Sequence, residues 1–179
     1  MNVLTPPSLI EPPHRVMLGS GRWITIRAIE SHDVEGLSSF YRQLSPDARH
    51  ARFLSASSGL AVKAAQHFAQ VDHVVEEGLV AVLHEAGPAD GVIVGHLCLE
   101  PNEDGEEVGV AVADEFRGHG IGTALMKEAV AWATRRGRSR LTADLYPTNT
   151  PMRRLMLAAG RPVMIDRIRA GVEEITLAL

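Results

Sequence analysis

From residue 23 to the C-terminus, apolar residues recur either at every second position or at every third and fourth position. Alternation, as in residues 23–29, is typical of a half-buried strand, and helical spacing, as in residues 34–44, is typical of an amphipathic helix. The predicted strands span about residues 23–29, 79–84, 91–100, 107–112, 141–145, 163–168 and 172–179, and the predicted helices span 31–44, 45–53, 58–69, 121–136 and 150–159. This order predicts an α/β (α+β) fold with a mixed sheet and helices on both faces.

Turn and capping residues support these boundaries. Turn-rich segments at 87–90 and 101–105 join three successive strands, which predicts an antiparallel meander. Ser31 and Ser45 are expected helix N-caps, and Asn149 or Thr150 is expected to cap the last helix. Glycines are expected to end two of the helices, at Gly137 and Gly160.

The first twenty residues differ from the rest of the chain because they are rich in proline, with Pro6, Pro7, Pro12 and Pro13. Proline removes a backbone donor and biases the preceding residue toward extended conformations. We therefore expect a loose Pro-rich extension over residues 1–20, followed by one domain over residues 21–179.

Composition narrows the class of protein. With 179 residues, of which 45% are hydrophobic and 22% charged, the chain is unlike disordered, collagen-like or coiled-coil sequences. A formal net charge of -4 provides no basic excess for nucleic-acid phosphates. The single cysteine, Cys98, excludes an internal disulfide, and the histidines lack the spacing of metal ligands, so we expect no metal. Apolar runs are far shorter than the roughly 20 residues that span a bilayer, so we expect a cytoplasmic protein without membrane or nucleic-acid partners.

The segment with the clearest chemistry follows the strand at 107–112. Arg117, Gly118, His119, Gly120, Ile121 and Gly122 form a glycine-rich turn at the start of a long helix. Glycines let backbone N–H groups converge on a ligand, and a helix N-terminus adds unpaired donors and a positive dipole end. This arrangement favours an anion, and a diphosphate fits it well.

Two other phosphate-binding motifs match this segment poorly. A dinucleotide-binding fold requires a third glycine where Thr123 stands, and it requires more strand-helix units than follow here. Asp144 lies at a suitable distance for a ribose contact, but this match alone is weak. A Walker A loop requires a lysine directly after Gly122, where the chain has Thr123.

The segment does resemble the signature of the GCN5-related N-acetyltransferase (GNAT) family, Arg/Gln-x-x-Gly-x-Gly/Ala, at every position from Arg117 to Gly122. The resemblance extends over about residues 22–179. Residues 27–33 and 44–53 are similar to the acetyltransferase domain of bacterial protein lysine acetyltransferases. The resemblance implies a mostly antiparallel sheet that splays between the fourth and fifth expected strands, which span residues 107–112 and 141–145.

The resemblance also implies a cosubstrate, acetyl-CoA, and a set of residues that bind it. Backbone groups of the central strand would hold the pantetheine arm, the glycine-rich loop would hold the diphosphate, and Asn149 would contact pantetheine or position its helix. The expected cofactor-binding residues are Val110, Ala111, Val112, Arg117, Gly118, His119, Gly120, Ile121, Gly122, Thr123 and Asn149.

The implied reaction is direct attack of a primary amine on the thioester. Since such an amine, with a pKa of about 10.4, is protonated at neutral pH, a base is required. Protein-acetylating members place a glutamate on the central strand at the position of Glu107, and Glu106 is the alternative if the register slips by one residue. The tyrosine that many members use as an acid is replaced by Met156. Tyr146 is an alternative acid, although a packing role is favoured for it.

The acceptor remains open in the sequence. The resemblance favours a protein lysine, whereas a small-molecule amine is the alternative, and a homodimer is compatible with either. The alternative to an enzyme is a regulatory or interaction module that binds acyl-CoA without significant turnover. Two pairs of arginines each have two interpretations. Arg49 and Arg52 either line an entrance for an acidic acceptor or form surface ion pairs, and the ion pairs are favoured slightly. Arg153 and Arg154 either reach a 3′-phosphate of the cofactor or lie at the solvated helix surface, which is the commoner case.

Overall fold

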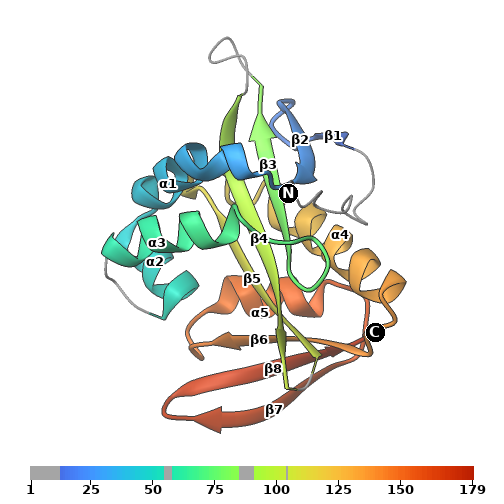
Figure 1. Ribbon diagram of the computed structural model, residues 1–179. Coiled ribbons are helices and arrows are strands. Elements are labelled where there is room, and N and C mark those ends of the chain that lie inside the picture. Colours follow the sequence, from blue (N-terminus) through green and yellow to red (C-terminus); the bar gives the residue numbers. More distant parts are fainter. Residues whose placement is uncertain (1–12, 55–57, 85–90, 104) are drawn as a thin grey trace, which may run out of the picture.

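The computed structural model describes residues 13–54, 58–84, 91–103 and 105–179, and it confirms the expected α/β architecture (Figure 1). Eight strands form one sheet in the order β1-β2-β3-β4-β5-β6-β8-β7. The strands are β1 His14–Met17, β2 Trp23–Ala28, β3 Glu77–Leu83, β4 Val92–Asn102, β5 Gly105–Val112, β6 Arg140–Leu145, β7 Val163–Arg169 and β8 Val172–Ala178. The helices are α1 Val34–Gln43, α2 Pro46–Phe53, α3 Ser58–Phe68, α4 Ile121–Arg135 and α5 Thr150–Leu157, with short 3-10 turns at Ser31–Asp33 and Asp114–Phe116.

Helices cover both faces of the sheet, and each face has its own apolar core. On one face, α1 and α3 pack against β3 and β4 through a cluster that includes Leu37, Tyr41 and Phe68. On the other face, α4 buries Leu125 and Trp132 against the same sheet. Strand alternation explains this division because successive side chains point to opposite faces.

The sheet splays apart in its centre, as the resemblance implied. Six of the seven neighbouring strand pairs are antiparallel, and β5 and β6 form the parallel pair. Their register is confined to Glu106 with Leu141 and Glu107 with Thr142, near the start of both strands. The rest of β5 therefore diverges from β6 and leaves a gap that begins beside Glu107.

The expected caps are confirmed at two helices and wrong at one. The Ser45 hydroxyl accepts the Ala48 N–H at 3.2 Å, and the Asn149 side chain accepts the Met152 N–H at 3.2 Å. Ser31 does not cap α1. Instead, residue 30 begins a 3-10 turn whose capping box is closed by Asp33.

The first described strand begins earlier than the alternation pattern predicted. β1 lies within the expected extension and pairs with β2 in an antiparallel register, with Val16 opposite Ile24. Its four residues are too short and too polar to show a clear period. Residues 1–12 of the expected extension and the expected turn at 87–90 lie outside the described residues.

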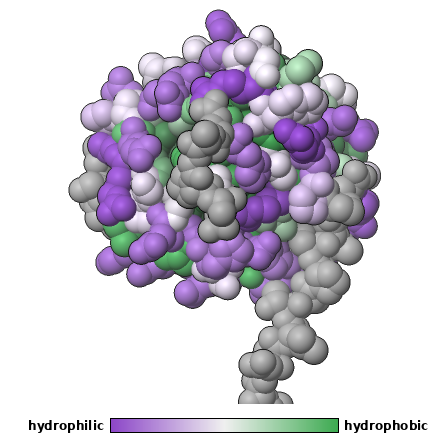
Figure 2. Space-filling model, turned by 90° about the horizontal axis from the view of Figure 1, so that it is seen from above, coloured by the Kyte–Doolittle hydropathy of each residue, from purple (hydrophilic) through white to green (hydrophobic). Residues whose placement is uncertain are grey.

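The surface seen from above is predominantly hydrophilic, with apolar residues in small separate areas (Figure 2). Among the helices that the structure describes, none is long and apolar enough to cross a membrane.

Candidate functional site

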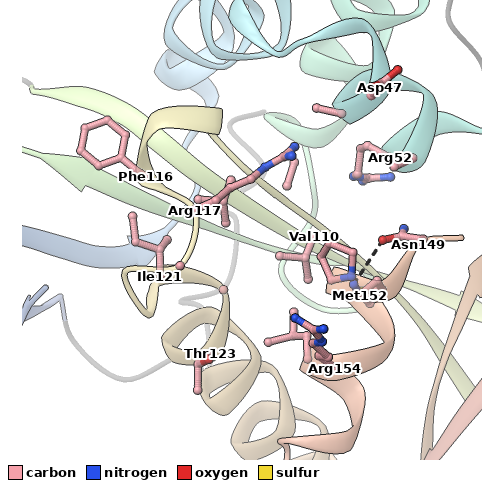
Figure 3. A pocket seen from close by; sticks show the side chains of 18 of the residues that line it. Asp47, Arg52, Val110, Phe116, Arg117, Ile121, Thr123, Asn149, Met152 and Arg154 are labelled. Carbon is pink, nitrogen blue, oxygen red and sulfur yellow. Dashed lines mark hydrogen bonds between the residues drawn. The ribbon is translucent and has the colours of Figure 1, made fainter. Parts of the chain in front are cut away.

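A cavity of about 860 Å³ opens where the sheet splays. Four elements surround it: α2, β5, the loop that leads into α4, and the segment from the end of β6 through α5 (Figure 3). Its lining residues are Asp47, Ala48, His50, Ala51, Arg52, Val110, Ala111, Val112, Phe116, Arg117, Gly118, Gly120, Ile121, Gly122, Thr123, Tyr146, Thr148, Asn149, Pro151, Met152, Arg154, Leu155 and Ala158.

The backbone of β5 presents alternate hydrogen-bonding groups to the gap. The Ala113 N–H donates to the Val94 carbonyl of β4 at 2.9 Å. Since backbone groups alternate in direction along a strand, Ala111 also faces β4, whereas Val110 and Val112 face the gap. The Thr142 hydroxyl of β6 reaches the Glu106 carbonyl at 3.5 Å, which agrees with this alternation. An extended ligand in the gap can therefore pair with β5 as an additional strand would.

The glycine-rich loop forms a cradle at the N-terminus of α4. Gly118 and Gly120 adopt left-handed backbone angles, with φ of +77° and +92°, which glycine tolerates best. A Cβ placed at either position would meet no atom within 4 Å, so the space above the loop is open. Gly120 is the N-cap of α4, whose first N–H groups have no partner within the helix. This cradle fits a diphosphate, as expected from the sequence.

Ten of the eleven expected cofactor-binding residues line the cavity, and His119 does not. The Nδ1 atom of His119 is buried without a hydrogen-bond partner among the described residues, away from the lining. Arg117 lines the cavity while its Nη2 atom lies 3.2 Å from the Asp114 carboxylate. The structure therefore brings the loop together around the cavity but turns the His119 side chain elsewhere.

Glu106 and Glu107 lie on opposite faces of β5. The Glu106 carboxylate is fully buried on the α4 face, where the Arg138 Nε atom lies 2.7 Å away. Glu107 is exposed on the α2 face and is not among the residues that line the cavity. Partial desolvation raises the pKa of Glu107, and the nearby carboxylates of Asp144 and Glu100 raise it further. Of these two glutamates, Glu107 is therefore the one whose carboxylate is open to proton exchange.

Helix α2 forms one wall of the cavity. The expectation of surface ion pairs for Arg49 and Arg52 is wrong. Arg49 donates to the backbone carbonyls of Arg42 at 3.1 Å and Leu44 at 2.6 Å, so it fastens α2 to the end of α1. The Arg52 guanidinium lies against the sheet, over Gly109 of β5, with Nη2 2.9 Å from the Cys98 Sγ atom of β4.

The other aromatic and basic candidates lie as follows. Tyr146 lines the cavity, and its ring stacks on His50 with centroids 5.0 Å apart. Met156 is fully buried in the core and outside the lining. Arg153 forms an ion pair with Glu173, whereas Arg154 lines the cavity.

One group of side chains in the described ranges can approach a metal ion together. His67, Glu76 and Glu100 bring three ligand atoms within 4.8 Å of one another. The His67 Nε2 atom already lies 2.8 Å from the Glu100 carboxylate, a hydrogen bond that accounts for the closeness of these two. The group lies outside the cavity lining.

Comparisons with known proteins agree with this geometry. The sequence profile of the Acetyltransferase (GNAT) family matches residues 43–160. A curated relative, an acetyltransferase of Pseudomonas aeruginosa, is 29% identical over 152 residues, which cover 84% of this chain and 82% of that protein. The solved GNAT domain of PAT from S. lividans is 27% identical, with a TM-score of 0.81 over 93% of this chain and 97% of that chain. A spermidine N-acetyltransferase from Vibrio cholerae, solved with CoA and spermine, shares the fold at 15% identity, with a TM-score of 0.63 over 87% of this chain and 95% of that chain.

Proposed function

Because the chain belongs to the Acetyltransferase (GNAT) family, we propose that it transfers an acetyl group from acetyl-CoA to the primary amine of an acceptor, with a protein lysine as the favoured acceptor. Acyl transfer from acetyl-CoA is the chemistry of the family. The observation that carries the proposal for this chain is the cavity, in which the glycine cradle at α4 meets the free backbone edge of β5.

The described residues fit the cosubstrate along its length. Gly118 and Gly120, with the first N–H groups of α4, would hold the diphosphate, and Arg117 and Arg154 supply positive charge at the rim. The gap-facing backbone groups of Val110 and Val112 would pair with the pantetheine arm. Asn149 is held in place by its bond to the Met152 N–H and lies on the opposite wall (Figure 3).

Glu107 is the proposed general base. Bound acetyl-CoA supplies an activated acetyl thioester. The Glu107 carboxylate takes one proton from the ammonium group of the acceptor, and the amine nitrogen bonds to the acyl carbon. The C–S bond breaks with its electron pair on sulfur, and the CoA thiolate leaves and takes up the second proton that the nitrogen loses. A raised pKa suits this role because it brings the carboxylate closer to the pH at which the enzyme works. A backbone N–H of β5 is the proposed donor to the thioester carbonyl, as in an oxyanion hole.

The preference for a protein lysine rests on similarity. The S. lividans PAT domain is similar at 27% identity over nearly its whole length, and two segments at the N-terminal end of the chain resemble protein lysine acetyltransferases. A small-molecule amine is the alternative acceptor. A solved polyamine acetyltransferase shares the fold, but at 15% identity it informs on fold alone.

A screen for acceptor-dependent thiol release tests the proposal. The purified chain is mixed with acetyl-CoA and, separately, with lysine peptides, polyamines and aminoglycosides, and free CoA thiol is measured. We expect release that depends on a peptide lysine and that disappears when the lysine is replaced by arginine. Thiol release at the same slow rate with and without every amine would contradict the proposal and would favour an acyl-CoA-binding module.

A further inference from the structure

The side chain of Arg52 is a partly buried cation that lines the cavity and that no carboxylate contacts. Its Nη2 atom contacts the Cys98 thiol at 2.9 Å, and its Nε atom is buried without a hydrogen-bond partner. Within the described residues, no carboxylate oxygen lies within 4.0 Å of the guanidinium nitrogens. Arginine in such surroundings normally forms a bidentate pair with a carboxylate.

The groups that do touch the guanidinium are neutral. Burial raises the pKa of Cys98 to about 11 and also raises the pKa of Tyr41, so neither ionises near neutral pH. The rings of Phe53 and Phe68 lie 5.1 Å and 5.0 Å from the Arg52 Cζ atom and compensate part of the charge. Glu100 and Glu107 supply negative charge near Arg52 but make no hydrogen bond with it, so the guanidinium retains hydrogen-bonding capacity for an anionic ligand.

The Arg52 guanidinium lies over the part of β5 that follows the proposed base, Glu107. Alternation places Glu107, Gly109 and Ala111 on one face of β5. A Cβ on Gly109 would lie only 2.7 Å from the Arg52 Cζ atom, so the missing side chain makes room for the guanidinium directly over the strand. Ala111 and Arg52 both line the cavity.

Arg52 is also separate from the cations that serve the diphosphate. It enters from α2, whereas Arg117 enters from the loop before α4 and Arg154 from α5 (Figure 3). The Arg52 guanidinium therefore lies over β5 at Gly109, between the proposed base and the proposed pantetheine-binding segment. A ligand there lies at the acyl group or at the acceptor amine.

We propose that Arg52 is a carboxylate-binding residue, so that one of the two substrates places a carboxylate group on its guanidinium while the amine approaches Glu107. The inference rests on the proposed function and narrows its substrate class. The carboxylate has two sources. It is either the free end of a dicarboxylic acyl group carried by CoA, or a carboxylate close to the reacting amine of the acceptor.

Two pairs of ligands, each differing only in the charge of one group, distinguish these sources. The first pair consists of unreactive CoA thioethers with a short chain that ends in a carboxylate or in a primary amide, and their affinities are measured by calorimetry. The second pair consists of an amino acid and its carboxamide as acceptors, compared by kcat/KM in thiol release. A charge-assisted hydrogen bond favours the carboxylate of the responsible pair by about tenfold to a hundredfold.

Three variants test whether any preference depends on Arg52. Arg52→Met should reduce the preference to about one, and Arg52→Lys should keep part of it, because lysine keeps the charge but loses the planar fork. Arg154→Met is the matched control, since it removes a cavity cation at the diphosphate end and should weaken both thioethers equally.

A ratio near one in both pairs for the unmodified protein overturns the proposal, even if Arg52→Met does not fold. A carboxylate preference that persists in Arg52→Met and Arg52→Lys also overturns it. Failure of the proposed function looks different: CoA itself would not bind, and no amine would increase thiol release.

Discussion

Glu106 and Glu107 are neighbours in the chain, yet the sheet gives them different chemistry. Glu106 is committed to Arg138 beneath α4, whereas Glu107 lies among other carboxylates on the open face. A carboxylate whose pKa is raised on folding destabilises the folded state when it is ionised. The free-energy contribution of Glu107 is therefore most favourable below its unfolded pKa and is lost as pH rises through its folded pKa.

Replacing Glu107 should consequently stabilise the fold at neutral pH. We expect Glu107→Gln to have a higher Tm than the unmodified protein at pH 7.5, with the difference shrinking as the pH falls to about 4, near the ordinary pKa of glutamate. Thermal unfolding at both pH values measures this. Glu103→Gln, an exposed acid beyond the end of β4, is the control and should change Tm little at either pH. A lower Tm for Glu107→Gln at pH 7.5 would be inconsistent with this electrostatic account.

The contribution of the Arg27–Asp33 pair to folding stability depends on pH in the opposite direction to that of Glu107. Both Asp33 oxygens accept from Arg27 at 2.7 Å, and one also accepts the Glu30 N–H at 2.8 Å. Burial alone would raise the pKa of Asp33, but these hydrogen bonds lower it. Its contribution to stability is therefore present at neutral pH and is lost as pH falls through the unfolded and then the folded pKa.

Removing this carboxylate takes away the bidentate ion pair of a partly buried guanidinium. We expect Asp33→Asn to lower the free energy of unfolding by about 3–5 kcal/mol at pH 7, measured by urea denaturation. Glu35→Gln, an exposed acid in the first turn of α1, is the matched control and should cost less than about 1 kcal/mol. Equal losses in the two variants would show that the Arg27 pair has no special role.

At the scale of elements, local signals predicted most of the helices and strands. Capping by Ser45 and Asn149 depends on residues within three positions, so the sequence shows it directly. β1 was missed because its place in the sheet depends on pairing with β2 rather than on its own pattern. The splay was inferred from family resemblance, since nothing local in β5 or β6 marks it.

The N-terminus of α4 makes a specific prediction about one glycine. Gly120 and Gly137 stand at opposite ends of α4, both with positive φ and both with open space where a Cβ would lie. Alanine at either position should therefore cost a similar amount, roughly 1–2 kcal/mol, through backbone strain. Only Gly120→Ala should also lower the affinity for acetyl-CoA, because only that Cβ would project into the diphosphate cradle. Calorimetric titration measures both affinities, and an equal loss in the two variants would remove the loop from the binding site.

At the scale of the whole molecule, the cavity joins parts that are far apart in the sequence. Sequence patterns identified the β5 strand and the glycine loop because both carry recognisable spacing. They left the role of α2 undecided between an acceptor entrance and a surface helix, because α2 reaches the cavity only through tertiary packing. The burial of Arg52 likewise depends on Gly109, Cys98 and Phe68, which no local pattern connects to it.

A direct contact ties the wall of the cavity formed by α2 to the glycine loop. The Ser45 N–H and hydroxyl bind the Asp114 carboxylate at 2.9 Å and 3.0 Å, so the start of α2 is tied to the turn before the glycine loop. The wall that carries Arg52 and the cradle that is proposed to hold the diphosphate are therefore held at a fixed separation. Glu107 lies beside the gap between them.

The pH dependence of amine-driven thiol release tests this account most directly. In the unmodified protein, kcat/KM should fall at low pH with a single-proton slope as Glu107 becomes protonated. Glu107→Gln should lose that limb and about 10²–10⁴-fold in rate, while its affinity for acetyl-CoA stays unchanged. An acid limb and a rate that are the same in both proteins would contradict the assignment of Glu107 as the base in this cavity.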